Sequence, residues 1–249
     1  MSEHSHIEEF HSGSRLATSR RMLLGQAVLA SACGLTGIAH HSAKHSVQAE
    51  ESKPILSPQT PEDALKMLYE GNVRFAEERT LASHRDISRV KEVAQEQKPF
   101  AEFLGCADSR VPIEIVFDQG FGDLFVTRIA GNVASSENIG SLEFGTRILG
   151  AKVLYVLGHT NCGAVNATMQ GSEVPGQISG LFQHIRPAVK AAKGDLQKAI
   201  LENVRNQAIL LAEASPVISG MVQRKELIVA GGIYDLATGS VTPVDVAVS

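Results

Sequence analysis

Residues 153–170 read VLYVLGHTNCGAVNATMQ, and this stretch indicates the fold class. Its first part, Val153–Leu157, is an apolar run of strand length that is rich in β-branched side chains, and Ala164–Gln170 at its end has the composition of a helix. His159 and Cys162 lie between them. A buried strand that leads through a polar turn into a helix is typical of an α/β protein with a parallel sheet.

The same alternation continues on both sides of this stretch. Further strands are predicted at Phe100–Gly105, Leu124–Ile129 and Leu227–Ala230. Further helices are predicted at Ser141–Leu149, Leu181–Ala192 and Leu196–Ala214. Strands that are apolar along their whole length need cover on both faces. The expected fold is therefore an α/β domain whose parallel-sheet core of about four strands is flanked by helices.

This domain is expected to comprise residues 60–249. Thr60 can cap a helix whose first position is Pro61, and acidic residues follow in the first turn, where carboxylates favour the helix dipole. Apolar side chains form a discontinuous stripe along Ala64–Phe75. The stripe predicts an N-terminal helical arm that packs on another part of the fold or on a partner subunit.

The chain before this helix is not expected to belong to the domain. Arg20 and Arg21 precede a weakly apolar run at 22–39, and this order resembles a twin-arginine export signal. Polar residues and glycines make the run too weak for a membrane span of about 20 apolar residues. Residues 1–43 are therefore predicted as an export signal and 44–59 as a linker, which places the mature protein in the periplasm or outside the cell without a stable membrane span. A polar tail with a chance arginine pair is the alternative.

Composition limits the classes of function. The chain has 249 residues, 43% of them hydrophobic, and a formal net charge of -4. These values exclude a collagen-like or multi-span membrane protein and give no indication of a nucleic-acid partner. Six of the nine histidines and Cys33 lie within the first 45 residues. The predicted domain therefore keeps few soft metal ligands, which draws attention to Cys106, His159 and Cys162.

These three residues follow the ends of predicted strands. Carboxyl ends of parallel strands meet at one edge of a sheet, so the three side chains are expected to lie together. Two thiolates and one imidazole form a three-ligand zinc set that leaves the fourth tetrahedral position open for water, as in catalytic zinc sites. Two alternatives remain: Cys106 and Cys162 are buried as small hydrophobic side chains, or they form a disulfide in an oxidising compartment.

The residues around these ligands resemble the β-class carbonic anhydrases, in the plant-like branch and as an exported bacterial or cyanobacterial form. The similarity includes CADSRVP at 106–112, RIAGN at 128–132, GHTNCGA at 158–164 and GGIYD at 231–235. It covers nearly the whole chain from Glu62 to Val244. Phe103 stands where another branch has the tryptophan of an inhibitory bicarbonate site, so that site is not expected here.

The resemblance implies zinc-dependent, reversible hydration of carbon dioxide to bicarbonate and a proton. It implies that Cys106, His159 and Cys162 bind zinc. Asp108 is implied as the carboxylate that orients the nucleophile, and Arg110 as the partner that keeps this carboxylate charged and turned away from the metal. The resemblance leaves open a closed state in which Asp108 itself takes the fourth zinc position.

A second set of residues is expected to bind the small-molecule substrate. The resemblance implies that Gln97 donates a hydrogen bond near the substrate. Val111, Phe125 and Gly163 are candidates for the walls and backbone donors of a narrow apolar pocket, although core positions explain them equally well. The resemblance also implies a homodimer, or a dimer of dimers, in which the helical arm reaches the partner and both subunits line each cleft.

Two other functions remain open from the sequence. One is hydrolysis of a CO2 analogue such as carbon disulfide on the same zinc scaffold. The other is a non-catalytic binding protein in which Cys106 and Cys162 form a disulfide. His84 and His184 are read as solvated histidines rather than as proton shuttles, because a single surface histidine is more often only solvated.

Overall fold

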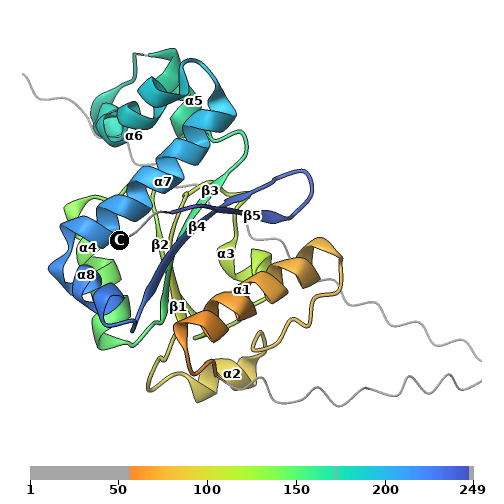
Figure 1. Ribbon diagram of the computed structural model, residues 1–249. Helices are drawn as coiled ribbons and strands as arrows, with labels where there is room; N and C mark the ends of the chain where they lie inside the picture. Colours follow the sequence, from red (N-terminus) through yellow and green to blue (C-terminus); the bar gives the residue numbers. More distant parts are fainter. Residues whose placement is uncertain (1–56, 172, 247–249) are drawn as a thin grey trace, which may run out of the picture. The chain divides into compact units, whose positions relative to one another are not determined.

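The computed structural model describes residues 57–171 and 173–246, which pack around one sheet (Figure 1). Its five strands are β1 (Ala101–Gly105), β2 (Leu124–Arg128), β3 (Val153–His159), β4 (Ile228–Tyr234) and β5 (Val241–Val244). Their order across the sheet is β2-β1-β3-β4-β5. The first four strands are parallel, which confirms the predicted core. The predicted export signal at 1–43 and all but the last three residues of the linker at 44–59 lie outside the described residues.

Helices cover both faces of this sheet. They are α1 (Pro61–Ala76), α2 (Ile87–Glu92), α3 (Ile113–Val116), α4 (Ser136–Glu143), the π-helix η1 (Phe144–Ile148), α5 (Gly163–Gln170), the 3-10 helix η2 (Gly176–Ile178), α6 (Ser179–Ala192), α7 (Leu196–Ala214) and α8 (Pro216–Gln223). Helices α1 and α3 lie on one face, and α4, α7 and α8 lie on the other (Figure 1). Within the described ranges, every helix is too short or too polar to cross a bilayer.

Successive side chains along a strand pack on opposite faces of the sheet. Phe103 and Tyr155 face α1 and α3, with ring centroids 5.4 Å apart. Leu104, which follows Phe103, packs with the residues of α7 and α8. Gly158 of β3 lets α7 approach closely, because a Cβ atom there would lie 2.5 Å from Cγ2 of Val204. Cover on both faces explains why these strands are apolar along their whole length.

The helical arm packs on its own sheet. Asn72 is buried in the middle of α1 and connects three segments of the chain. Its Nδ2 donates to the carbonyl oxygens of Val116 and Gly239, at 3.1 and 2.9 Å. Its Oδ1 accepts the N–H of Val241 at 2.7 Å. One amide therefore joins α1 to α3 and to the hairpin that precedes β5.

One helix begins earlier than predicted. The prediction of a helix at Ser141–Leu149 is wrong at its start, because α4 begins at Ser136 and continues into the π-helix η1. The residues before Leu142 are mostly polar or glycine and give no apolar period, so the start is hidden in the sequence. At the junction of the two helices, Thr146 Oγ1 donates to the carbonyl oxygens of Leu142 and Glu143, at 2.9 and 3.3 Å.

The other predicted elements are confirmed within a few residues. Helix α7 has the predicted bounds, and its cap Asp195 accepts the N–H of Lys198. Strands β3 and β4 run on to His159 and Tyr234, further than predicted. Helices α2, α3 and α8 and the antiparallel strand β5 were not predicted from the sequence. Pro243 within β5 speaks against a strand unless it lies at an edge, which is where β5 lies.

The topology places a crevice between β1 and β3. These strands are neighbours, with Gly105 in register with Leu157. The chain leaves β1 for β2 on one side and later enters β3 on the other side. In open parallel sheets, ligands bind beyond the carboxyl ends of the strands at such a switch point.

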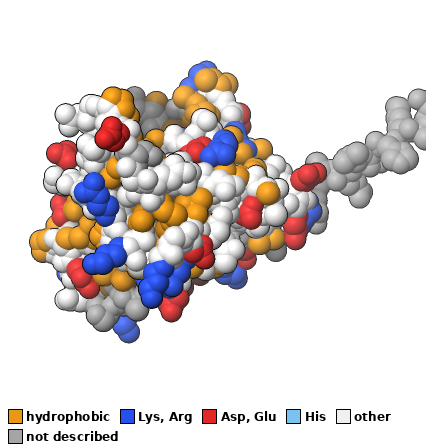
Figure 2. Space-filling view, turned by 90° about the horizontal axis from the view of Figure 1, so that it is seen from above, with side chains coloured by type: hydrophobic (Ala, Val, Ile, Leu, Met, Phe, Trp, Pro, Cys, Tyr) orange, Lys and Arg blue, Asp and Glu red, His pale blue; other side chains and the backbone are white. Residues whose placement is uncertain are grey.

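The surface carries charges of both signs. Figure 2 shows acidic and basic side chains interspersed over one face, with hydrophobic side chains gathered between them. No extended patch of one sign is visible among the described residues on that face. This distribution agrees with the small net charge of -4 and does not resemble the basic footprint of a nucleic-acid-binding protein.

Candidate metal centre

Three soft ligands meet at the switch point. Cys106 follows β1, His159 ends β3, and Cys162 precedes the first residue of α5. One ligand atom from each side chain lies within 4.8 Å of the other two. All three residues are buried. The structure therefore brings together the three residues that the sequence selected as metal ligands.

The His159 ring is oriented by its own loop. Its Nδ1 lies 2.9 Å from the carbonyl oxygen of Thr160, and because a carbonyl only accepts, Nδ1 carries the proton. The lone pair is therefore on Nε2. This buried nitrogen has no hydrogen-bond partner within the described part of the chain. A histidine that donates from one nitrogen and leaves the other free inside a buried site has the arrangement of a metal ligand.

The two cysteine side chains are free thiols rather than a disulfide. A hydrogen bond between the two sulfur groups lowers the pKa of Cys106 and raises the pKa of Cys162. The backbone N–H of Gly131 also donates to Cys106 Sγ, at 3.3 Å. The two cysteines therefore ionise unequally, and Cys106 loses its proton more easily than Cys162.

The Asp108 carboxylate lies beside the three ligands. Arg110 holds it with two parallel bonds, from Nε to Oδ1 at 2.9 Å and from Nη2 to Oδ2 at 2.7 Å. This bidentate pairing lowers the pKa of Asp108 well below its ordinary value. The same Oδ2 lies 3.8 Å from Nε2 of His159. The carboxylate is therefore ionised, faces the ligand cluster and is bonded to Arg110.

Arg128 fixes the backbone on both sides of Ala107. Its Nε donates to the carbonyl oxygen of Cys106 at 3.0 Å, and its Nη2 donates to the carbonyl oxygen of Asp108 at 2.5 Å. Arg128 ends β2, which pairs with β1. One side chain therefore fixes the relative position of the first ligand and of the carboxylate.

The second ligand loop is attached to β4. The N–H of Thr160 donates to the carbonyl oxygen of Tyr234 at 2.9 Å, and Thr160 Oγ1 accepts the N–H of Leu236 at 3.1 Å. Asn161 has a left-handed backbone, with φ of 55°. These contacts explain why the run GGIYD at 231–235 accompanies the ligand motifs in this sequence: it holds the loop that carries His159 and Cys162.

The predicted substrate-binding residues do not all lie near the ligands. Gly163 directly follows Cys162 and is exposed, whereas Val111 directly follows Arg110 and is fully buried in the core. Gln97 is exposed on the loop before β1, and Phe125 lies near the amino end of β2. Within one chain, Gln97 and Phe125 are therefore at the opposite end of their strands from the ligand cluster. Their role in substrate binding stays a prediction.

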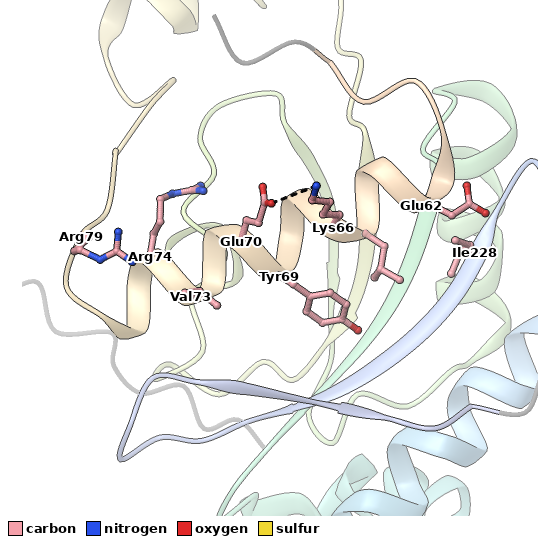
Figure 3. Close-up of a pocket in the computed structure, with 9 residues that line it drawn as sticks. Glu62, Lys66, Tyr69, Glu70, Val73, Arg74, Arg79 and Ile228 are labelled. Atoms are coloured by element: carbon pink, nitrogen blue, oxygen red, sulfur yellow. Dashed lines mark ion pairs between the residues drawn. The ribbon is translucent and has the colours of Figure 1, made fainter. Parts of the chain in front are cut away.

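A spacious groove lies away from this site. It has a volume of about 650 Å³ and runs along the outer side of α1, where Tyr69 and Val73 lie among the side chains in Figure 3. It contains no metal-ligand cluster among the described residues. A smaller pocket of about 370 Å³ lies beside Arg110 and Asn161. We locate the chemistry at the ligand cluster, because its three soft donor atoms converge there, whereas the charged side chains that line the groove on α1 form no such cluster.

The donor set fits a zinc ion. Two sulfur atoms and one neutral imidazole nitrogen are donors that Zn2+ prefers, and three of them from the protein are typical of catalytic sites. A cation between the three ligands would give the unpaired Nε2 of His159 a partner. It would also lower the raised pKa of the Cys162 thiol. The residues present therefore match this metal in number, type and protonation.

Sequence reasoning missed several residues that hold this site. Arg128 and Gly131 lie in the quoted run at 128–132 but were assigned no role. Asn203 and Gln207 on α7 are buried and connect to the same loop. The sequence does contain one indication of their role: these two amides lie one helical turn apart within the apolar stripe of a long helix, where polar side chains are unusual.

Known proteins share this arrangement at the level of sequence. A family model described as carbonic anhydrase matches residues 101–241. Carbonic anhydrase 2 of Mycobacterium tuberculosis is 36% identical over 187 residues, which cover 72% of this chain and 90% of that relative. The carbonic anhydrase of Mycolicibacterium smegmatis is 35% identical over 189 residues, which cover 73% of this chain and 92% of that relative.

Solved structures agree with these relatives. The Coccomyxa β-carbonic anhydrase, solved in complex with acetazolamide, is 30% identical and superposes with a TM-score of 0.57, covering 72% of this chain and 86% of that one. A tetrameric β-carbonic anhydrase of Sordaria macrospora has a TM-score of 0.60 at 20% identity and covers 64% of this chain and 87% of that one. At this identity the second likeness shows the fold alone.

Proposed function

Because the chain belongs to the β-carbonic anhydrase family, we propose that it catalyses the reversible hydration of carbon dioxide to bicarbonate and a proton. One observation carries the proposal: the ligand atoms of Cys106, His159 and Cys162 converge within 4.8 Å beside the ion-paired Asp108 and Arg110. This is the combination of groups that the reaction requires, a soft metal site next to a fixed carboxylate.

Cys106, His159 and Cys162 would hold a zinc ion. When bound, Zn2+ supplies the Lewis acidity that makes water nucleophilic near neutral pH. Two thiolates offset the charge of the ion, so the protein must assist the nucleophile with a group of its own. Asp108 lies in the place for that task, since its Oδ2 is 3.8 Å from the His159 nitrogen that faces the other ligands.

Asp108 is proposed to accept a hydrogen bond from the attacking water and to turn its lone pair towards carbon dioxide. Arg110 keeps the carboxylate ionised and orients it through the bidentate pair. While that pair is intact, Asp108 is held by Arg110 and not by the metal ligands, which favours the open state of the site. Arg128 holds the backbone that carries both Cys106 and Asp108.

The proposed activity is tested by stopped-flow assays of the zinc-loaded, full-length chain on carbon dioxide and on carbon disulfide. We expect carbon dioxide hydration well above the buffer rate and no hydrolysis of carbon disulfide above its background. Activity on carbon disulfide alone would replace the proposed substrate with its analogue, since the same ligand set would serve both.

We further propose that the chain forms a homodimer or a dimer of dimers. Gln97 and Phe125 are far from the ligands along their own strands, so a substrate pocket that includes them needs a second copy. The apolar groove on α1 (Figure 3) and the exposed aromatic ring of Phe144, which pairs with Phe125, are surfaces that a copy would cover. Sedimentation should give two or four times 26.6 kDa. A monomer at micromolar concentration would contradict this.

Export is proposed from the sequence alone. Arg20 and Arg21 precede the weakly apolar run at 22–39 in the order of a twin-arginine signal. Such a route carries folded protein, so the thiols would meet their metal before an oxidising compartment. In cell fractionation, the chain should leave the cytoplasm, and a variant with both Arg20→Lys and Arg21→Lys should stay inside. Equal export of the two chains would contradict the assignment.

A further inference from the structure

The Cys106 sulfur receives a hydrogen bond from a loop on another element. The N–H of Gly131 donates to Cys106 Sγ at 3.3 Å. Gly131 lies between β2 and α4, and 25 residues separate it from the ligand. Hydrogen bonds to a sulfur ligand stabilise its charged form and set how it binds a metal. The direction of this N–H therefore matters for the metal site.

The peptide at Gly131 is part of a tight turn. Ile129 accepts the N–H of Asn132 at 2.9 Å, and Gly131 has a φ of +76° between them. That backbone favours glycine, as at the third position of a type II turn. A Cβ atom on Gly131 would lie 2.7 Å from Cδ1 of Ile185. Since glycine has the most backbone freedom of any residue, contacts from outside the turn must hold this peptide in place.

Helix α7 provides those contacts. Asn203 Nδ2 donates to the carbonyl oxygen of Gly131 at 2.9 Å. One helical turn later, Gln207 Oε1 accepts the N–H of Ala134 at 2.8 Å, so α7 grips the loop at two points. Gln207 Nε2 donates to Asn203 Oδ1 at 3.4 Å and to the carbonyl oxygen of His184 at 3.3 Å. The two amides thus orient each other and the loop.

These amides lie where apolar side chains are expected. Asn203 and Gln207 are 1% and 2% exposed, on the stripe that also contains Val204, Ala208 and Leu211. A buried amide costs free energy unless it is hydrogen-bonded. Here both amides form hydrogen bonds with the loop that contacts Cys106. These bonds offset the cost of burial and fix the loop in place.

We propose that Asn203 and Gln207 are positioning residues for the Cys106 ligand. They hold the turn at Gly131 so that its N–H points at the sulfur. This hydrogen bond sets how strongly the Cys106 thiolate donates electrons to a metal and how tightly it binds it. The inference rests on the proposed zinc site. It adds a control of that site from α7: Asn203 holds the carbonyl group of Gly131, and the N–H of the same residue, in the preceding peptide unit, contacts the sulfur of Cys106.

Metal release and a sulfur spectrum test this role on the full-length chain. We expect Asn203→Leu, which keeps the core filled, to lose zinc to a chelator at least about tenfold faster than the wild-type chain, because a sulfur that is no longer held by the N–H is more readily protonated and displaced. In the Co2+-loaded variant, the thiolate-to-cobalt charge-transfer band should move to lower energy, because a sulfur without its N–H bond is a stronger donor. Gln207→Leu leaves the Asn203–Gly131 bond in place and should give smaller changes in the same directions.

Ser215→Ala is the matched control. Ser215 is buried at the start of α8, accepts the N–H of Ile218 at 3.1 Å and donates to Glu143, but it does not contact the metal loop. It should lower thermal stability and leave zinc release and the cobalt band unchanged. Wild-type release and an unmoved band in both amide variants would overturn the positioning role. A wild-type chain that binds neither metal would overturn the zinc site, and this inference with it.

Discussion

At the residue scale, the geometry of Asp108 decides whether the site is open. Both of its oxygens are bonded to Arg110, at 2.9 and 2.7 Å, and one lies 3.8 Å from His159 Nε2. The pairing keeps the carboxylate ionised, with a pKa well below its ordinary value. The carboxylate is thus an acceptor near the ligands without being one of them.

Asp108→Asn should keep zinc and lose most of the hydration activity. The amide fits the same space but carries an N–H2 group and no charge, so it cannot accept as the carboxylate does. We expect kcat/KM to fall by a factor of about 100 or more, measured by stopped flow at matched zinc content. Asp195→Asn, at the cap of α7, removes one exposed acidic charge and should retain full activity. Wild-type activity of Asp108→Asn would contradict the assigned role.

Glu102 is an unexpected residue for the centre of a sheet. It is 0% exposed in β1, and neither of its carboxyl oxygens has a hydrogen-bond partner within the described residues. A Cβ atom on Gly145 would lie against its Oε2, so glycine makes room for the carboxyl group. Burial raises the pKa of Glu102 to about 9. Glu102 is therefore neutral at pH 7.

Glu102 should make the folded state less stable as the pH rises. Between its ordinary pKa of 4.5 and about 9, the folded chain binds a proton that the unfolded chain has lost. Stability therefore falls through this window, by up to about 1.4 kcal/mol per pH unit. Glu102→Met removes the effect, so urea unfolding should show its advantage over the wild-type chain growing from pH 5 to pH 8. Glu102→Gln, which does not titrate, should show the same trend.

A constant difference between Glu102→Met and the wild-type chain across that range would contradict the neutral, buried state of Glu102. The sequence alone gave no indication of this residue. Glu102 lies within the predicted strand Phe100–Gly105, and a strand pattern does not tell whether a charged side chain points into the core. Cover by η1, whose Gly145 lies against the carboxyl group, decides it.

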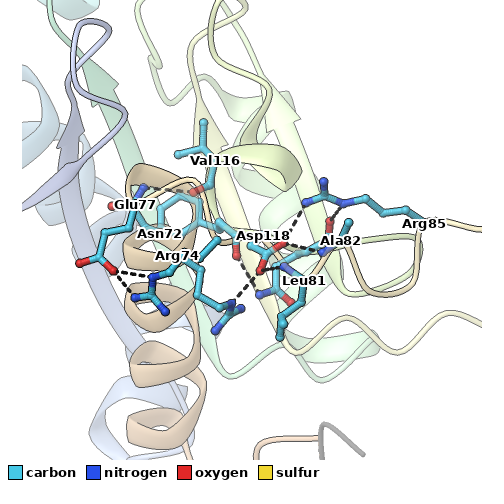
Figure 4. Close-up of polar contacts among 11 residues, drawn as sticks. Asn72, Arg74, Glu77, Leu81, Ala82, Arg85, Val116 and Asp118 are labelled. Atoms are coloured by element: carbon cyan, nitrogen blue, oxygen red, sulfur yellow. Dashed lines mark hydrogen bonds and ion pairs between the residues drawn. The ribbon is translucent and has the colours of Figure 1, made fainter. Parts of the chain in front are cut away.

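At the element scale, one carboxylate holds the loop that follows α1. Asp118 has a fully buried side chain, and its two oxygens accept the N–H groups of Leu81 and Ala82, each at 3.0 Å. Arg74 and Arg85 also contact it (Figure 4). Burial alone would raise its pKa, but these hydrogen bonds outweigh that effect and lower it.

Asp118→Ala should destabilise the fold and free the loop. Two backbone N–H groups lose their acceptor, and we expect a loss of roughly 2–4 kcal/mol in the free energy of unfolding. Trypsin should cut faster after Arg79 and Arg85, measured by limited proteolysis. Glu77→Ala removes only an exposed ion pair with Arg79 and should change stability by less than about 0.5 kcal/mol. Equal proteolysis of Asp118→Ala and the wild-type chain would contradict the role of this carboxylate.

The elements differ in how well the sequence predicts them. Helix α7 was predicted to the residue, because its apolar period is long and Asp195 caps it. The start of α4 was not predicted because its first turn consists mainly of polar residues, which give no apolar period. The ligands were found because each follows a strand, a local pattern. The contacts of Asn203 with the loop at Gly131 join segments 72 residues apart, and no local pattern reveals them.

At the scale of the whole molecule, the parallel sheet explains the site. After β1 the chain crosses to β2 on one side of β1, and it later returns to β3 on the other side. The loops that follow β1 and β3 therefore meet at one crevice, and both carry metal ligands. Hydrogen bonds from β2, β4 and α7 hold both loops. The metal site is thus a product of the fold, and the central claim is that this site binds zinc and that the zinc is needed for the reaction.

The most direct measurement is carbon dioxide hydration as zinc is returned to the chelated, full-length chain. We predict that the rate rises in proportion to bound zinc and levels off at about one ion per chain in the cluster. Cys106→Ser keeps the histidine-rich N-terminal segment but should lose both the rate and that ion, which separates the cluster from other zinc binding. A zinc-loaded wild-type chain with no rate above buffer, or a rate independent of zinc, would contradict the account.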